Sequence, residues 1–197
     1  MTTWKYKDYK QWIIDGYKVN NKVTILNLDA CDLTTLSENI DNLINLRKLS
    51  CNYNFNELIE LPKTLGNLIN LQQLDCRFNK LTLPKTLGNL INLQKLNCGF
   101  NKLTELPKIF DNLINLQTLW CNDNQLTELP KTFNNLINLR YLNCSNNQLT
   151  ELPKTLGNLI NLQELKCHTN KLTELPKTLG NLINLQKLIC YDNELTE

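Results

Sequence analysis

The sequence contains few of the residues on which most enzyme sites depend: one histidine, one methionine and six glycines among 197 residues. A single histidine leaves no pair for a metal site, and so few glycines argue against a phosphate-binding loop. The eight cysteines form no Cys-x-x-Cys pair, so the usual zinc spacing is also absent. Composition therefore argues against an enzyme, a bound cofactor and a structural metal.

Long apolar runs and an excess of one charge are also missing. No stretch approaches the roughly 20 apolar residues that span a membrane. The start, MTTWKYKDYKQWIIDG, lacks the apolar core of a signal peptide. The 21 basic and 19 acidic residues nearly cancel, which argues against nucleic acid and anionic membranes as partners. We therefore expect a cytoplasmic protein with neither kind of partner.

Leucine and asparagine are abundant, with 42 and 32 residues, and both recur at a fixed spacing. From Val23 onward the chain divides into eight rows, most of them 23 residues long. The rows begin at Val23, Leu46, Leu71, Leu93, Leu116, Leu139, Leu162 and Leu185. The second row has two extra residues near Phe55 and Asn56, the third lacks one glutamate, and the last stops early. This repetition predicts a solenoid over residues 23–197, with seven full repeats and a truncated eighth.

Each row has the pattern of one coil. In LQKLNC, residues 93–98, alternating apolar residues predict a short strand with one buried face. The proline of LTELPK then begins a short helical or 3-10 turn. An asparagine after each strand can bond the backbone of the bend, so its repetition predicts a continuous ladder. The ladder residues are Asn54, Asn79, Asn101, Asn124, Asn147, Asn170 and Asn193.

The rows resemble the leucine-rich repeat family, whose signature LxxLxLxxNxL has cysteine here in place of its third leucine. The row length and the second half, LPxxLxNLxNL, are similar to the intracellular Ras-group-related subclass. The Asn, Ile and Lys bias is also similar to repeat proteins of giant DNA viruses of amoebae, which implies the host cytoplasm as location. The resemblance covers residues 23–197. It implies an α/β solenoid, a right-handed horseshoe with a parallel concave sheet of about eight strands and short turns on the convex side.

Residues 1–22 do not follow the repeat. Aromatic and apolar residues recur there at helical spacing, at Tyr6, Tyr9, Trp12 and Ile13. Gly16 follows as a stop signal. We predict a short amphipathic helix that caps the first coil, because a solenoid leaves the apolar end of its first repeat open. The alternative is a basic, aromatic docking arm.

Seven cysteines share one inward slot of the strand. They are Cys51, Cys76, Cys98, Cys121, Cys144, Cys167 and Cys190, whereas Cys31 falls in the asparagine slot of the first row. We expect reduced thiols that act as small buried hydrophobic residues. Cys167 and His168 would point to opposite faces of their strand, so they cannot form a nucleophile–base pair.

The rows differ most at their outward strand positions, which is typical of a repeat protein that binds a partner on its concave face. Trp120 and Tyr141 stand out, because exposed aromatics are enriched at binding hot spots and the two lie within diagonal reach on adjacent strands. The candidate binding residues are Trp120, Tyr141, Asp75, Arg77, Lys95, Phe100, Asn143, Lys166 and His168. Just before the ladder asparagine, Tyr53, Phe78 and Phe100 form another column and are expected to stack.

We therefore predict a non-enzymatic module that binds a protein or peptide, with no catalytic residue, cofactor or metal. The alternative is a targeting subunit that recruits a separate enzyme: a phosphatase, an enzyme of a GTPase pathway or one of ubiquitin transfer. A nucleic-acid or glycan binder is a third interpretation. The eighth row stops at Glu197 beside Leu175, Leu179 and Leu182, whose ends should be exposed. Two such ends could pack as a two-fold homodimer; a frayed coil in a monomer is the alternative.

Overall fold

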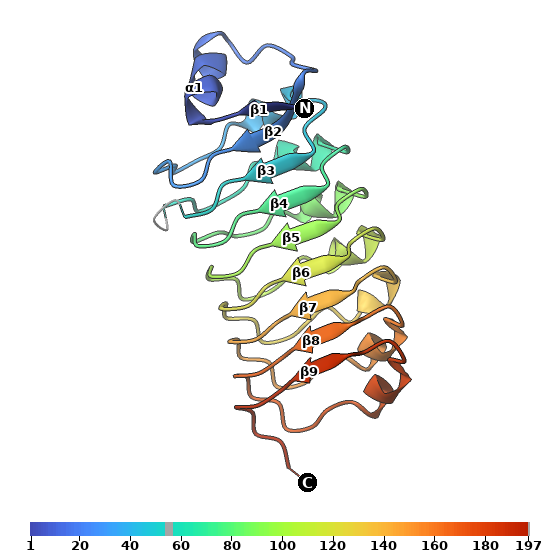
Figure 1. Cartoon of the computed structure of the whole chain (residues 1–197). Coiled ribbons are helices and arrows are strands. Elements are labelled where there is room, and N and C mark those ends of the chain that lie inside the picture. The colour runs from blue at the N-terminus through green and yellow to red at the C-terminus, as the bar shows by residue number, and fades with distance from the viewer. Residues whose placement is uncertain (54–56, 197) are drawn as a thin grey trace.

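The computed structural model describes residues 1–53 and 57–196, and these form a stack of coils with one open parallel sheet of nine strands (Figure 1). Each strand pairs with the next one along the chain. The strands are β1 (Thr2–Trp4), β2 (Val23–Asn27), β3 (Lys48–Ser50), β4 (Gln73–Asp75), β5 (Lys95–Asn97), β6 (Thr118–Trp120), β7 (Tyr141–Asn143), β8 (Glu164–Lys166) and β9 (Lys187–Ile189). The predicted solenoid is confirmed, with one strand more than expected because residues 2–4 also pair.

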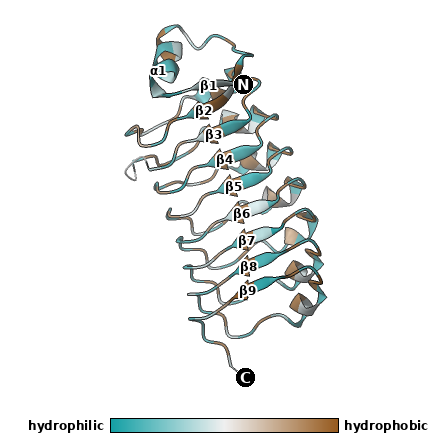
Figure 2. Ribbon diagram, in the orientation of Figure 1, coloured by the Kyte–Doolittle hydropathy of each residue, from teal (hydrophilic) through white to brown (hydrophobic). Residues whose placement is uncertain are grey.

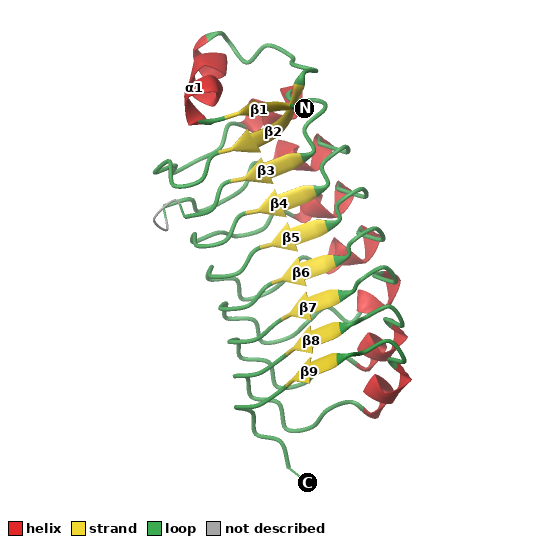
Figure 3. Cartoon of the chain, in the orientation of Figure 1, coloured by secondary structure: helices red, strands yellow, loops and turns green. Residues whose placement is uncertain are grey.

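Short 3-10 helices run along one side of the stack and alternate with the strands (Figure 3). They are η1 (Glu38–Asn42), η2 (Lys63–Asn67), η3 (Lys85–Asn89), η4 (Lys108–Asn112), η5 (Phe133–Asn135), η6 (Lys154–Asn158) and η7 (Lys177–Asn181). In η2, η3, η4, η6 and η7 a proline occupies the cap position. There its missing N–H costs no helical hydrogen bond, as the sequence predicted.

One continuous hydrophobic core runs through the stack, because every coil contributes apolar side chains from its strand, its bend and its 3-10 helix. In the fifth row Leu119 of β6, Leu126 after the bend and Phe133 of η5 are all buried. Figure 2 shows the resulting mixture of hydrophobic and hydrophilic residues along each coil. A single coil cannot enclose these side chains, so each depends on its neighbours for burial.

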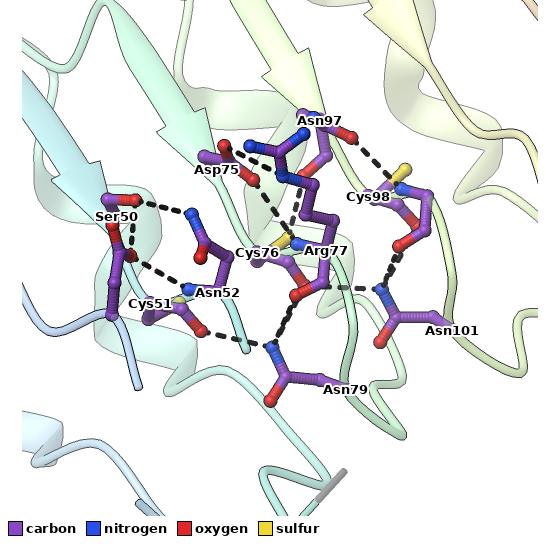
Figure 4. Close-up of polar contacts among 12 residues, drawn as sticks. Ser50, Cys51, Asn52, Asp75, Cys76, Arg77, Asn79, Asn97, Cys98 and Asn101 are labelled. Atoms are coloured by element: carbon purple, nitrogen blue, oxygen red, sulfur yellow. Dashed lines mark hydrogen bonds and ion pairs between the residues drawn. The ribbon is translucent and has the colours of Figure 1, made fainter. Parts of the chain in front are cut away.

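The predicted asparagine ladder is confirmed from Asn79 to Asn193, while Asn54 lies outside the described residues. The side-chain nitrogen of Asn101 donates to the carbonyls of Cys76, Cys98 and Gly99 at 3.0–3.2 Å (Figure 4). Its side-chain oxygen accepts from the Leu81 N–H at 2.9 Å. Each asparagine thus bonds two successive coils at the bend after the strand.

A second ladder, which the sequence analysis missed, bonds the coils where each 3-10 helix leads into the next strand. The side-chain nitrogen of Asn92 donates to the Ile69 carbonyl of the preceding row at 2.9 Å. Equivalent bonds start from Asn70, Asn115, Asn138, Asn161 and Asn184. Both ends of each strand are therefore tied to the neighbouring coil.

The N-terminal residues form β1 and then the helix α1 (Tyr6–Ile14), which lies at the top of the stack in Figure 1. Tyr9 and Trp12 of α1 are buried. The Tyr9 hydroxyl accepts from the Ser37 N–H at 2.9 Å, and the Trp12 indole donates to the Lys18 carbonyl at 2.7 Å. The expected helix is present; that residues 1–22 form a separate capping unit stays a prediction.

At the other end of the stack, β9 pairs with β8 on one side. Leu175 and Leu179 are partly exposed as expected, but Leu182 is buried, because it packs inside the core cluster. Glu197 lies outside the described residues, and the homodimer stays a prediction. No helix in the described part of the chain is long and apolar enough to cross a membrane.

Candidate partner-binding face

The side of the sheet that points away from the core, here called the open face, carries three side chains of each row. Alternation along the strand explains this: Leu119 and Leu142 point into the core, whereas Trp120 and Tyr141 point out. These two aromatic side chains are 41% and 40% exposed. Register pairs Trp120 with Asn143 and Thr118 with Tyr141, so the aromatics are diagonal neighbours on β6 and β7.

A depression of about 350 Å³ lies on the open face over strands β5 to β8. Its lining is Lys95, Thr118, Trp120, Tyr141, Leu142, Asn143, Glu164 and Lys166. It therefore brings together five of the nine predicted binding residues. Among the described residues no ring contact joins Trp120 and Tyr141, although the register makes them the diagonal neighbours that the sequence predicted.

Charges are paired on one side of the depression and unpaired on the other. The Glu164 carboxylate lies 3.2 Å from the Lys166 ammonium and 3.3 Å from that of Lys187. Desolvation acts to raise the pKa of Glu164, but the hydrogen bonds and charges of the two lysines outweigh it and lower that pKa. Lys95 has no ion pair within the described part of the chain. The depression thus offers one cation to a partner.

Asp75 lies on β4, the strand next to β5 at the edge of the depression, and Arg77 lies just after β4. Their side chains form an ion pair at 3.4 Å, and the Arg77 N–H donates to the Asp75 carboxylate (Figure 4). Burial raises the pKa of Asp75, and the Arg77 charge opposes this only in part. The Arg77 guanidinium also lies 5.7 Å from the centre of the Tyr53 ring. The pair belongs to the neighbourhood of the aromatic column rather than to the depression.

The predicted stack of Tyr53, Phe78 and Phe100 is confirmed, with ring centroids 4.2 and 4.1 Å apart. All three residues have positive φ, between 52° and 56°. The sequence did not reveal this left-handed conformation, which is uncommon for bulky residues. In later rows the same position holds Asp123, Asn146, Thr169 and Asp192. Phe100 therefore belongs to this stack, and His168 stacks on Tyr191 at 4.6 Å, so neither lines the depression.

An exposed column of isoleucines lies near the start of the strands, beside the second asparagine ladder. Its members are Ile44, Ile69, Ile91, Ile114, Ile137, Ile160 and Ile183. The first six are 44–56% exposed. The repeated LINL of the sequence is the signal for this column, which the sequence analysis did not predict.

The cysteines show no sign of reactivity. Six of the predicted inward thiols are buried and Cys190 is half-buried. Burial raises the pKa of Cys98 and of Cys167 to about 12, so both stay protonated at neutral pH. In residues 1–53 and 57–196 no three His, Cys, Asp or Glu side chains form a possible metal site.

Two family models match the sequence. One, described as "Leucine Rich repeats (2 copies)", matches residues 91–136, 114–158 and 137–182, and the other, "Leucine Rich Repeat", matches residues 70–90. Together they cover residues 70–182, more than half of the chain. The chain belongs to the leucine-rich repeat family. No curated protein sequence matches it.

Solved leucine-rich repeat structures are similar along most of the chain. A leucine-rich repeat protein of Leptospira interrogans is 33% identical over 90% of the chain, with a TM-score of 0.52. The ectodomain of the Arabidopsis thaliana receptor kinase GASSHO1/SCHENGEN3, in complex with CASPARIAN STRIP INTEGRITY FACTOR 2, is 31% identical over 89%, with a TM-score of 0.78. The plant peptide hormone receptor RGFR1, in complex with RGF2, is 28% identical over 88%, with a TM-score of 0.69. The chain spans 57%, 22% and 32% of these three proteins.

Proposed function

We propose that this leucine-rich repeat chain binds a protein or peptide through its open face, and that the depression beside Trp120 and Tyr141 is the centre of the contact. The observation that carries this proposal is the pair of exposed aromatic side chains at one hollow of a sheet. Exposed Trp and Tyr are enriched at binding hot spots, because they bury much apolar area and lose little conformational entropy.

The lining indicates what the partner presents. Trp120 and Tyr141 form an apolar surface for a hydrophobic side chain, and Lys95 beside them, which has no ion pair among the described residues, is a cation for a carboxylate. A depression of about 350 Å³ is at the small end for a ligand pocket, but it accommodates one or two side chains of a larger partner. We therefore propose an acidic segment with one large apolar residue.

Rigidity of the open face supports binding by a preformed surface. The two asparagine ladders hold both ends of the strands, so little backbone ordering accompanies binding. The peptide hormone receptor RGFR1, in complex with RGF2, and the receptor kinase GASSHO1/SCHENGEN3, in complex with CASPARIAN STRIP INTEGRITY FACTOR 2, support the use of this fold in partner recognition. For this chain, recognition on the open face remains our proposal.

The finer assignments rest on the sequence. We propose a cytoplasmic module of the Ras-group-related subclass that acts without catalysis and without nucleic acid. We also propose that the chain has a viral origin and that it forms a homodimer. Recruitment of a separate enzyme is a further use of the same face. The single histidine supports action without catalysis, and the near balance of charge supports action without nucleic acid.

A peptide-display selection on the immobilised chain tests the proposal. We expect acidic peptides with a large apolar residue, whose affinity falls at least about tenfold when both Trp120→Ala and Tyr141→Ala are introduced. The matched control carries Lys131→Ala and Lys154→Ala on the coil segments behind the sheet, and it should bind as the wild type does. Selected peptides that bind the aromatic double variant normally but lose the control would contradict the proposal.

A further inference from the structure

The third row borders a cleft that is wider than the corresponding clefts described farther along the stack. After each bend the chain returns toward the 3-10 helix through a segment that reads LTELPK in most rows, here called the return segment. In the third row it is one residue shorter and reads LTLPK, residues 81–85. Between it and the return segment of the fourth row, residues 103–108, lies a cleft of about 570 Å³. The corresponding clefts farther along measure about 310 and 280 Å³.

The shortened segment also exposes an apolar wall. Leu83 is only partly buried, although the residue before the proline is 2–3% exposed in the neighbouring rows, at Leu61, Leu106, Leu129 and Leu152. Because the segment is one residue shorter, Leu83 is less deeply buried than the equivalent leucines of the neighbouring rows. Leu83 therefore lines the cleft together with Leu103 and Pro107.

The missing residue is a glutamate, and its absence unbalances the charge around the cleft. Three lysines, Lys85, Lys102 and Lys108, line it with one carboxylate, Glu105. None of the three lysines takes part in an ion pair among the described residues. The next cleft carries two lysines and two glutamates, Lys108, Lys131, Glu105 and Glu128, so its charges cancel. The largest cleft is thus the one with an excess of positive charge.

We propose that this cleft binds a small amphipathic anion: a hydrocarbon group that carries a carboxylate or a phosphate. Its volume lies within the range of small-molecule sites. Leu83 and Pro107 would contact the hydrocarbon, while Lys85, Lys102 and Lys108 neutralise the head group. The site is separate from the open face, because its lining comes from the return segments and not from strands β1 to β9.

Titration of the ¹⁵N-labelled full chain with octanoate and, separately, with octyl phosphate tests this site. We expect saturable amide shifts in residues 82–85 and 102–106, and the stronger of the two binders identifies the preferred head group. The uncharged 1-octanol should bind at least about tenfold more weakly, because it lacks the charge that the lysines attract. Equal binding of 1-octanol, or no saturable shifts with either anion, would overturn the proposal.

Two variants locate the effect. Insertion of a glutamate between Thr82 and Leu83 restores the standard return segment, and it should weaken the anion at least about tenfold, because it narrows the cleft and adds a negative charge. Lys85→Gln with Lys102→Gln should weaken it similarly without touching the backbone. The matched control, Lys131→Gln with Lys154→Gln in the charge-balanced clefts, should leave binding unchanged. Loss of binding in the control, or normal binding in both test variants, would show that the anion binds elsewhere.

Discussion

The side-chain amide of Asn124 donates to the carbonyl of Cys98, one coil away, at 3.1 Å. The same amide group also donates to the Cys121 and Asn122 carbonyls of its own coil, and its oxygen accepts from the Leu103 N–H at 3.0 Å. One asparagine therefore satisfies three carbonyls and one N–H at the bend. Side chains that bond several backbone groups in this way hold a loop in a single conformation.

Replacing this amide should destabilise the stack. Asn124→Ala leaves the Leu103 N–H without its partner and removes one of the hydrogen bonds that each of the three carbonyls accepts, so we expect a loss on the order of 1–3 kcal/mol in the free energy of unfolding. Urea denaturation followed by circular dichroism measures it. Asn134→Ala is the control, because the Asn134 side chain bonds only its neighbour Asn135. A neutral Asn124→Ala would mean that other contacts hold the bend.

The repeated features of this fold were predictable because the spacing of the repeats and the residue types at each position indicate the same structure. Alternation in LQKLNC located β5, and the recurrent asparagine implied the ladder, since a buried amide needs several partners. Trp120 and Tyr141 were identifiable because they are aromatic residues at outward strand positions, which vary from row to row and are mostly polar or charged. The structure brings them together with Lys95 at one depression.

Features that depend on backbone geometry or on a single exception were not predictable. Residues Thr2–Trp4 carry no alternation signal, and pairing with β2 alone makes them a strand. The left-handed conformation of Phe78 comes from the bend, whereas aromatic residues seldom favour positive φ. The cleft at Leu83 follows from one missing residue, whose effect on burial only the packed coils reveal.

The buried thiols should resist labelling. Six of them, Cys51, Cys76, Cys98, Cys121, Cys144 and Cys167, have no access to solvent. We therefore expect Ellman's reagent at neutral pH to react quickly with Cys31 and Cys190 only, which are partly exposed, and with all eight after unfolding in guanidinium chloride. Rapid reaction of several further thiols in the folded protein would show that the inward slot is open.

The same thiols should make the protein sensitive to alkali. Burial raises their pKa values above the ordinary value of 9.0, to about 12 for Cys98 and Cys167, so between these values the unfolded chain loses protons that the folded chain keeps. Stability is therefore retained below pH 9 and lost as the pH rises toward 12. Between pH 9 and 10 each thiol should contribute a loss of about 1 kcal/mol.

Urea denaturation at pH 8, 9 and 10 measures this loss. Cys98→Val and Cys98→Val with Cys121→Val should flatten the pH dependence stepwise, whatever the variants do to stability at pH 8. Cys31→Val is the control, because this thiol is partly exposed and its removal should change the slope less than removal of a fully buried thiol. Parallel pH profiles for wild type and the double variant would contradict the assignment to buried thiols.

Two glycines in equivalent positions should respond differently to substitution. A Cβ at Gly157 of η6 would meet the Thr178 carbonyl oxygen of η7 at 2.3 Å, whereas a Cβ at Gly180 of η7 meets nothing within 4 Å. Gly157→Ala should therefore destabilise by about 1–3 kcal/mol through overpacking. Gly180→Ala should be neutral or slightly stabilising. Thermal melts compare the two directly, and equal effects would mean that successive 3-10 helices are less closely packed than the structure indicates.

The unpaired charge of Lys95 should set the salt dependence of partner binding. Lys166 and Lys187 share the Glu164 carboxylate, whereas Lys95 at the depression has no ion pair among the described residues and is free to attract a partner's carboxylate. For an acidic peptide selected on the open face, we expect Lys95→Gln to weaken binding about three- to tenfold at low salt and to flatten its salt dependence, since a rim charge acts mainly through screened attraction.

Lys48→Gln is the control for this prediction. It lies at the equivalent position on β3, so it removes the same charge outside the depression and should have little effect. Titrations of wild type and both variants at 50 and 300 mM NaCl separate these cases. Equal weakening by the two substitutions would mean that the overall charge of the sheet attracts the peptide. If Lys95→Gln had no effect, the partner's carboxylate would not lie at the depression.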